Sequence, residues 1–451
     1  MRAPTIEFHG GVREIGGNKV LITDGPDRVL FDFGPSFDPK FEQFYVDYLK
    51  PRSTSPVKDL LEFDLLPWID GLYAREALAG LEERYREPLV HAVFVSHAHF
   101  DHAGYLNLID PEIPVHLGEG TKTVLDAIET SGATKYGEHP WRTFRSGQVV
   151  RVGRIEVSPL SVDHSVPFAF GFRIRTSEGT IIYTGDFRQH GPRASLTHAF
   201  LEEVAREPPE ALIIEGTRAG PDPRRNFTEE AVRRGVDKVL GTTDDLALVT
   251  CYPRDVDRLT TLYQAAAESG RDLVVPFKTA HLLATLASEE GPKIPVPGRD
   301  PHLRVYRRPK KSYYKFERPF LDDAVDADWV RRHGREVLML LDMHQFTELI
   351  DLRPPAGTPF IRSMSEPFSE EDVKEAVLKN WMEHFRLGFH QFHASGHCSG
   401  PELLSIIGEI APRSLYPIHT EHPEAFERSA RQVVLPERGV PYRVDPGAPR
   451  P

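Results

Sequence analysis

Four potential metal ligands fall within six consecutive residues of this chain. The run His97-Ala98-His99-Phe100-Asp101-His102 follows a mostly apolar stretch at residues 89–95, which is typical of a buried strand. A chain that leaves a strand turns in a loop, so these side chains are free to converge on one point. Imidazole nitrogen and carboxylate oxygen suit zinc or manganese. The run therefore predicts a catalytic metal site; a solvated polar loop is the alternative.

The four residues can divide between two ions, with His97 and His99 on one and Asp101 and His102 on the other. A two-metal site holds its ions about 3.5–4 Å apart and needs more ligands than these. Three further candidates sit at turns just past apolar strands, and they are His164, Asp186 and His419. Each alone reads as an ordinary turn or surface residue, but together with the run they complete a ligand set.

Composition limits the classes of protein to which the chain can belong. The 451 residues exceed the size of a usual single core, so we expect two domains. A net charge of −12 excludes attraction of polyanions over the whole surface, so any nucleic-acid contact must be local. The two cysteines, Cys251 and Cys398, indicate a reducing compartment. No stretch approaches the roughly 18 apolar residues of a membrane span, and we expect a cytoplasmic protein without a membrane partner.

The order of predicted elements divides the chain. Short β-rich runs with glycine turns open it, and residues 35–85 form a more helical insertion that either caps the site or packs on the surface. From about residue 220, a strand at 246–252, a helix at 255–269 and a strand at 272–277 make a βαβ unit. Residues 388–392 and 414–418 are expected to be strands of the first domain again.

The ligand pattern resembles the metallo-β-lactamase fold, whose HxHxDH motif matches residues 97–102 and whose later ligands match His164, Asp186 and His419. The resemblance implies an α/β protein, an αββα sandwich in which Asp186 bridges two divalent ions. Zinc is the implied metal, with manganese as the alternative.

Three further segments resemble the β-CASP nucleases and, among them, the ribonuclease J group. Residues 212–218 match motif A with Glu215, residues 393–399 match motif B with His397, and His419 stands where motif C lies. The resemblance implies an inserted β-CASP domain at 219–385, between metallo-β-lactamase parts at 1–218 and 386–451. Ribonuclease J enzymes often carry an extra C-terminal domain, whereas this chain ends soon after His419, so a homodimer is left open.

The resemblance also implies roles. The catalytic residues would be Asp101, Glu215 and His397. Paired metal ions lower the pKa of water and stabilise charge on phosphoryl oxygens. His397 would protonate the leaving 3′ oxygen, with Glu215 orienting its ring; a structural histidine in a glycine-rich turn is the alternative.

Substrate contacts are predicted in two places. The resemblance implies a 5′-monophosphate pocket that includes Ser365, His393 and Ser395, although these residues also suit turns. Residues 304–316 interleave six cations with four aromatic residues, a pattern that favours either nucleic-acid contact or a solvated face.

The implied function is 5′-to-3′ degradation or processing of single-stranded RNA, with endonuclease activity as a further mode. A DNA nuclease of the same fold branch and a catalytically silent RNA-processing subunit are the alternatives. The intact ligand set argues against the silent subunit.

Overall fold

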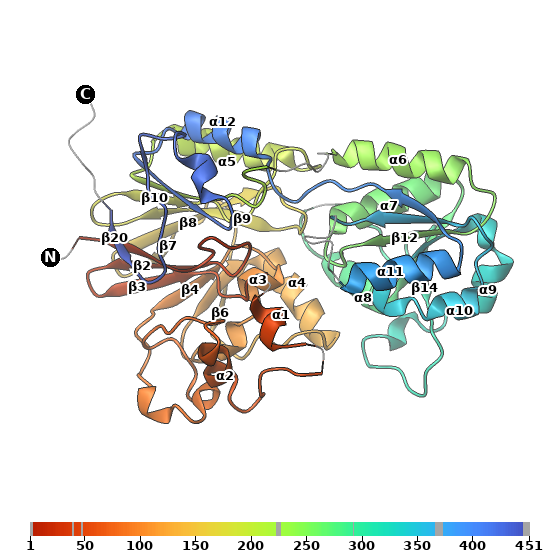
Figure 1. The fold of residues 1–451 in the computed structure, drawn as a ribbon, viewed down its shortest axis with the longest axis horizontal. Coiled ribbons are helices and arrows are strands. Elements are labelled where there is room, and N and C mark those ends of the chain that lie inside the picture. The colour runs from red at the N-terminus through yellow and green to blue at the C-terminus, as the bar shows by residue number, and fades with distance from the viewer. Residues whose placement is uncertain are drawn as a thin grey trace.

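The computed structural model describes residues 3–37, 40–46, 48–221, 227–291, 293–365 and 373–444, which form two lobes side by side (Figure 1). One lobe contains two seven-stranded sheets and the other a single six-stranded sheet. Among the described residues, no helix is long and apolar enough to span a membrane.

The first lobe is a sandwich. Its first sheet has the order β20-β1-β2-β3-β4-β5-β6 and its second the order β19-β18-β11-β10-β9-β8-β7. The strands of the first sheet are β1 (Thr5–Gly10), β2 (Lys19–Asp24), β3 (Asp27–Phe31), β4 (Ala92–Val95), β5 (Val115–Gly118), β6 (Trp141–Phe144) and β20 (Pro441–Arg443). Those of the second are β7 (Val150–Val152), β8 (Ile155–Val162), β9 (Ala169–Arg175), β10 (Thr180–Tyr183), β11 (Ala211–Glu215), β18 (Ser414–Ile418) and β19 (Gln432–Val433).

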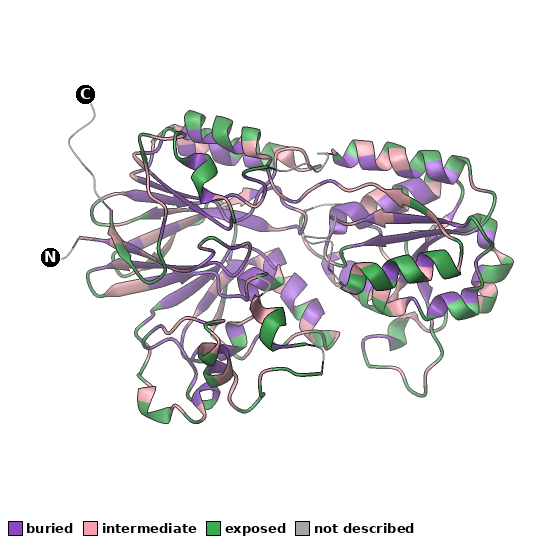
Figure 2. Ribbon diagram, viewed as in Figure 1, coloured by how far each residue is buried: buried purple, intermediate pink, exposed green. Residues whose placement is uncertain are grey.

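Alternating residues of the two sheets face each other across an aromatic core. Phe31 and Phe94 of the first sheet lie 5.3 and 6.0 Å, centroid to centroid, from Phe172 of the second. The outer face of the first sheet packs on α4 (Glu119–Thr130), and that of the second on α5 (Ala194–Ala205) and α12 (Gly400–Ile410). These four layers confirm the predicted αββα sandwich, and Figure 2 shows its strands buried beneath helices with exposed outer faces.

The second lobe is a parallel sheet with helices on both faces. Its strand order is β14-β13-β15-β12-β16-β17, from β12 (Ala247–Cys251), β13 (Asp272–Pro276), β14 (Leu303–Tyr306), β15 (Val337–Leu340), β16 (Pro359–Ser363) and β17 (Gly388–Gln391). One face packs on α6 (Glu229–Gly241), α7 (Val256–Glu268) and α8 (Phe277–Leu286). The other packs on α9 (Ala327–Arg332), α10 (Glu348–Leu352) and α11 (Val373–His384). Because both faces are covered, every residue of the central strands β12 and β15 is buried, as in other parallel sheets.

Two local expectations are wrong. Residues 388–392 do not return to the first lobe, because β17 pairs in parallel with β16 and extends the sheet of the second. Among its described residues, the insertion at 35–85 contains the short helices α1 (Lys40–Phe44) and α2 (Pro56–Glu62), and its segment at 74–85 forms the 3₁₀ turns Arg75–Leu78 and Glu82–Arg84 rather than an α-helix. Ser369, which is followed by three acidic residues and so suits a helix N-cap, lies outside the described residues.

Candidate metal centre

The seven candidate ligands meet at one edge of the sandwich. His97 follows β4, His164 follows β8, Asp186 follows β10 and His419 follows β18. The short helix α3 (Phe100–Ala103) carries Asp101 and His102. Because these strands end at the same edge, residues more than 300 positions apart in the sequence come into contact. All the ligands except half-buried His99 are buried.

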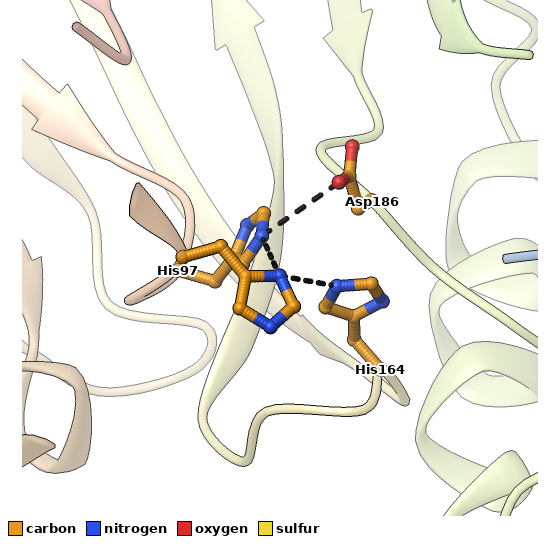
Figure 3. A group of neighbouring side chains, drawn as sticks. His97, His164 and Asp186 are labelled. Atoms are coloured by element: carbon orange, nitrogen blue, oxygen red, sulfur yellow. Dashed lines mark hydrogen bonds and ion pairs between the residues drawn. The ribbon is translucent and has the colours of Figure 1, made fainter. Parts of the chain in front are cut away.

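The first ligand group contains His97, His99, His164 and Asp186. His99 Nδ1 lies 3.1 Å from His97 Nε2 and 3.0 Å from His164 Nε2. Asp186 Oδ2 lies 3.7 Å from His97 Nε2. Figure 3 shows His97, His164 and Asp186 pointing toward one another.

The second ligand group contains Asp101, His102, Asp186 and His419. His102 Nε2 lies 3.1 Å from Asp186 Oδ2 and 3.3 Å from Asp101 Oδ2. His419 Nε2 lies 3.2 Å from Asp101 Oδ2 and 3.5 Å from Asp186 Oδ2. Asp186 therefore belongs to both groups, and its Oδ2 atom faces both.

The donor atoms fit a pair of divalent ions. Ligands bound tetrahedrally at about 2.0–2.2 Å lie roughly 3.3–3.6 Å from one another, close to the separations in both groups. The second carboxylate oxygen of Asp186 is buried and has no hydrogen-bond partner among the described residues. A buried carboxylate oxygen without a partner destabilises the folded protein. A cation bound at this oxygen would offset that free-energy cost.

The pKa values of the ligands differ between the two groups. Burial lowers the pKa of His97 and His164 well below the usual value and that of His99 to about 3, so these rings are neutral. Burial acts in the same direction on His102 and His419, but nearby carboxylates outweigh it. They hold the pKa of His102 well above its usual value and raise that of His419 to about 9. The second group thus pairs carboxylates with imidazolium ions whose protons a metal can replace.

The far nitrogen of four ligand rings is held by a neighbouring group that sequence reasoning missed. His97 Nδ1 lies 2.9 Å from Ser96 Oγ, and His419 Nδ1 lies 2.8 Å from Thr217 Oγ1. His164 Nδ1 donates to the carbonyl of Gly396 at 2.6 Å. Such partners fix the orientation of a ligating imidazole and raise its basicity.

Asp32 holds the fourth ring and is the most connected of the missed residues. It is fully buried, and its carboxylate lies 2.8 Å from His102 Nδ1. The same carboxylate accepts hydrogen bonds from the backbone and hydroxyl of Ser96 and from the hydroxyl of Tyr183. Its only sequence signal is its position directly after the apolar strand β3, a position that many structural residues share.

His397 and Glu215 form a pair at the rim of the centre. Glu215 ends β11, is 1% exposed, and its Oε1 lies 3.0 Å from His397 Nδ1. The His397 side chain is 19% exposed, and its ring centroid lies 5.1 Å from that of His164 and 5.7 Å from that of His419. The pair thus presents Nε2 of a partly exposed imidazole beside both ligand groups.

The loop that carries His397 is held through three consecutive carbonyls. Ala394 O accepts from Arg258 Nη2 at 3.4 Å, Ser395 O from His190 Nε2 at 2.9 Å, and Gly396 O from His164 Nδ1. Arg258 comes from the second lobe and the two histidines from the first, so the loop is positioned by both lobes.

Arg258 belongs to a buried ionic cluster between the lobes, here called the arginine network: Arg188, Arg193 and Arg258 with Asp163, Asp257 and Glu229. Arg188 and Arg193 each donate to Asp257 at 2.8 Å, and Arg258 contacts Glu229 at 2.7 Å. Arg188 also lies 3.4 Å from Asp163 and 3.9 Å from Glu229. The network joins the loop after β10 to the start of α6 and α7.

Two of the three proposed phosphate-pocket residues lie together. The Ser365 hydroxyl hydrogen-bonds the Tyr252 hydroxyl at 2.5 Å, and the Tyr252 ring lies 6.0 Å from that of His393. Tyr252 was not among the expected residues. Ser395 instead accepts a hydrogen bond from the backbone of His397 at 3.1 Å, which is the turn-forming use of its hydroxyl.

Most of the charged side chains in the run at 304–316 already form ion pairs within the protein. Four of its six cations have carboxylate partners: Arg304 with Asp272, Arg307 with Asp326, Arg308 with Glu348, and Lys310 with Glu317. Tyr306 and Phe316 are buried, while Tyr314 is 70% exposed. The run therefore packs as part of the second lobe, and its contact with nucleic acid stays a prediction.

Comparisons with known proteins point to one family. Residues 64–244 match a beta-lactamase superfamily domain, and residues 383–434 match a Zn-dependent metallo-hydrolase RNA specificity domain. The second match contains His397 and His419. A crystal structure of a protein of unknown function from Enterococcus faecalis has a TM-score of 0.79 and 25% identity, and the match covers 98% of this chain and 100% of that one.

Curated relatives carry the name ribonuclease J. The protein from Sinorhizobium meliloti is 24% identical over 91% of this chain and 68% of its own length. The one from Thermus thermophilus is 24% identical over 96% of this chain and 73% of its own. Ribonuclease J2 of Bacillus subtilis is 23% identical over 92% and 68%. With the sandwich, the second lobe and the converging candidate ligands, these matches show that the chain contains a beta-lactamase superfamily domain and is ribonuclease J-like over most of its length.

Proposed function

We propose that this chain is a two-metal phosphodiesterase that degrades or processes single-stranded RNA from its 5′ end, with internal cleavage as a second mode. One observation carries the proposal: Asp186 faces two ligand groups at once, and the His397–Glu215 pair lies beside them. The substrate class is supported by the ribonuclease J relatives and by the RNA specificity domain matched at residues 383–434.

The donor set supports zinc as the metal, with manganese as the alternative, because it consists of five imidazoles and two carboxylates without a thiolate. His97, His99, His164 and Asp186 would hold one ion, and Asp101, His102, Asp186 and His419 the other. When bound, the two ions supply a water of lowered pKa and positive charge for the phosphoryl oxygens.

The protein side chains supply the remaining steps. Water adds to phosphorus as the bond from phosphorus to the 3′ oxygen breaks, so the released nucleotide keeps its 5′ phosphate and gains a 3′ hydroxyl. His397 donates the proton to that 3′ oxygen from Nε2, since Nδ1 is engaged by Glu215. Glu215 is a positioning residue here, because it acts through the ring. The shortened RNA again begins with a 5′ monophosphate, so the next cycle meets the same chemical end.

Recognition of the 5′ phosphate falls to Ser365, His393 and Ser395 in this proposal, with Tyr252 added by its hydrogen bond to Ser365. Burial, reinforced by the charge of Arg258, lowers the pKa of His393 to about 3. A neutral His393 at pH 7 would contribute a hydrogen bond to the phosphate and no charge.

The test uses RNAs labelled at one end and carrying a 5′ monophosphate, a 5′ triphosphate or a 5′ hydroxyl, together with a DNA of the same sequence, with zinc or manganese added. Release of mononucleotides from the 5′-monophosphate RNA alone is expected. His397→Ala should abolish most of this activity, while His198→Ala, at an exposed position on α5, should not.

Each contrary outcome points to a stated alternative. Cleavage of DNA alone would favour a DNA nuclease, and binding of RNA without cleavage by any metal form would favour a silent subunit. A homodimer stays a prediction, which sedimentation of the same preparation tests.

A further inference from the structure

A cavity of about 470 Å³ lies in the first lobe, lined by residues that take no part in the metal centre. His9 and Lys19 come from the β1–β2 hairpin, Lys40 and Trp68 from the insertion at 35–85, and Arg438 from near the C-terminus. Its volume is within the range of small-molecule sites, about 300–1,000 Å³. The insertion thus forms one wall of a cavity.

Lys19 supplies a buried positive charge to this cavity. It is 3% exposed, and its Nζ donates to the carbonyls of Gly17 and Gly34, both at 2.7 Å. An ammonium group has three N–H donors, so one remains for a ligand. Burial lowers the pKa of Lys19 to about 8, so the group still carries its charge at pH 7.

His9 supplies a buried polar atom without a partner. Its side chain is 11% exposed, and its Nε2 has no hydrogen-bond partner among the described residues. The nearest carboxylate oxygen, on Glu7, is 3.7 Å away and beyond hydrogen-bond range. A buried polar atom left unsatisfied costs free energy, and a ligand with a polar group in the cavity would remove that cost.

The charges and rings of the lining select the ligand chemistry. Lys19, Lys40 and Arg438 outnumber the two carboxylates, Glu14 and Asp64, in a chain whose net charge is −12. Lys40 pairs with Asp64 at 2.9 Å and Arg438 with Glu14 at 2.7 Å, so the excess positive charge of the lining is that of Lys19, whose Nζ contacts carbonyls. The aromatic residues Phe41, Trp68 and Tyr105 line the same space. Clustered cations bind phosphate, and aromatic side chains stack on nucleobases.

We propose that this cavity binds a nucleoside 5′-monophosphate, with its phosphate at Lys19, Lys40 and Arg438 and its base against the aromatic wall. The choice of this ligand rests on the proposed function, because a 5′-exonuclease of this kind releases such nucleotides. The cavity is separate from the metal centre, so the same molecule would be product at one site and ligand at the other.

The test measures binding of AMP by isothermal titration calorimetry, with ribose 5-phosphate and adenosine as ligands that lack the ring or the phosphate. We expect each partial ligand to bind at least tenfold more weakly than AMP. Equal binding of ribose 5-phosphate and AMP would overturn the assignment of the aromatic wall, and no binding of AMP would overturn the site.

Variants locate the ligand. The double variant Lys40→Ala/Arg438→Gln should weaken AMP binding at least tenfold. The control Lys135→Ala/Arg206→Gln removes the same charge at positions whose side chains are 79% and 73% exposed and should leave binding within twofold. Equal loss in both variants would overturn the proposal, because it would mean a general charge effect.

Two further readouts separate this site from the metal centre. Trp68 fluorescence should change on AMP binding in the wild type and not in Trp68→Phe. Asp186→Asn should bind AMP as the wild type does; loss of binding there would place the ligand at the metal centre and overturn the inference. Because binding is measured without catalysis, a chain that binds AMP but cleaves no RNA would refute the proposed function alone.

Discussion

The metal centre and the arginine network are both buried clusters of charged and polar groups, but only the network contains its own permanent cations. In the network each guanidinium already contacts carboxylates, with Arg188 and Arg193 sharing Asp257 and Arg258 contacting Glu229. The seven ligands of the metal centre include no permanent cation, and their donor atoms face one another. The network therefore pairs cations and carboxylates of the protein itself, whereas the candidate ligands offer donor atoms that a divalent cation would join.

The largest effect should come from removing the ions. Asp186→Asn, or treatment with a chelator, should slow cleavage of 5′-monophosphate RNA by about 10⁴-fold or more, since both ions lose a shared ligand or are lost. Mass spectrometry of the protein's metal content and the cleavage rate measure this. Normal cleavage by metal-free protein would show that the seven candidate ligands do not act through bound ions.

Breaking the network should act on the fold. Arg258→Met leaves Glu229 buried without its partner and should lower the free energy of unfolding by about 3–5 kcal/mol, measured by urea denaturation. Arg206→Met breaks the exposed pair with Glu203 and should cost no more than about 1 kcal/mol. If the two variants unfold alike, the network does not hold the lobes together.

The proton donor should rank next. His397→Ala should lower kcat by about 10²–10³-fold, the usual contribution of general acid catalysis, while the bound metal stays at the wild-type amount. Loss of metal from this variant would make His397 part of the ion site and not of the proton transfer.

Replacing Asp32 tests whether the carboxylate that orients the His102 ring contributes to metal affinity. Asp32→Asn should weaken metal affinity by about 10–100-fold, because His102 loses the carboxylate that orients it. Asp24→Asn is the matched control, since Asp24 is equally buried but its carboxylate accepts hydrogen bonds from Ser177. Competition with a chromogenic chelator measures both affinities, and equal weakening would count against the role of Asp32.

The smallest effect is expected in the run at 304–316. Lys311→Ala/Lys315→Ala changes two exposed lysines and should weaken RNA binding by no more than about threefold at moderate salt, since few phosphate contacts are lost. Filter binding at two salt concentrations measures it. A loss of tenfold or more would place RNA along this run.

The convergence of the candidate ligands could be predicted from the sequence because metal binding constrains residue type at short spacing. Four ligands lie within six residues, and the others follow apolar strands whose ends meet at one edge. Asp32 and Thr217 could not be found in this way, because a hydrogen bond to the far side of an imidazole leaves no spacing pattern. Asp32 and His102 are 70 positions apart.

The other wrong predictions concern the strand or side chain with which a segment pairs. The strand β17 was recognisable as a strand, but its four residues do not say which sheet they join; pairing with β16 decides it. The cations at 304–310 looked available because their partners, such as Asp272 and Glu348, come from distant parts of the second lobe.

The ring of His164 contacts both the candidate metal ligands and the loop that carries His397. Its Nε2 atom faces the first ligand group, and its Nδ1 atom holds the carbonyl of Gly396, next to His397. A single rigid imidazole cannot tilt toward one neighbour without moving away from the other. In the proposed mechanism, binding of an ion by His164 would therefore also position the backbone beside His397, and a chain without metal would have its proposed proton donor displaced.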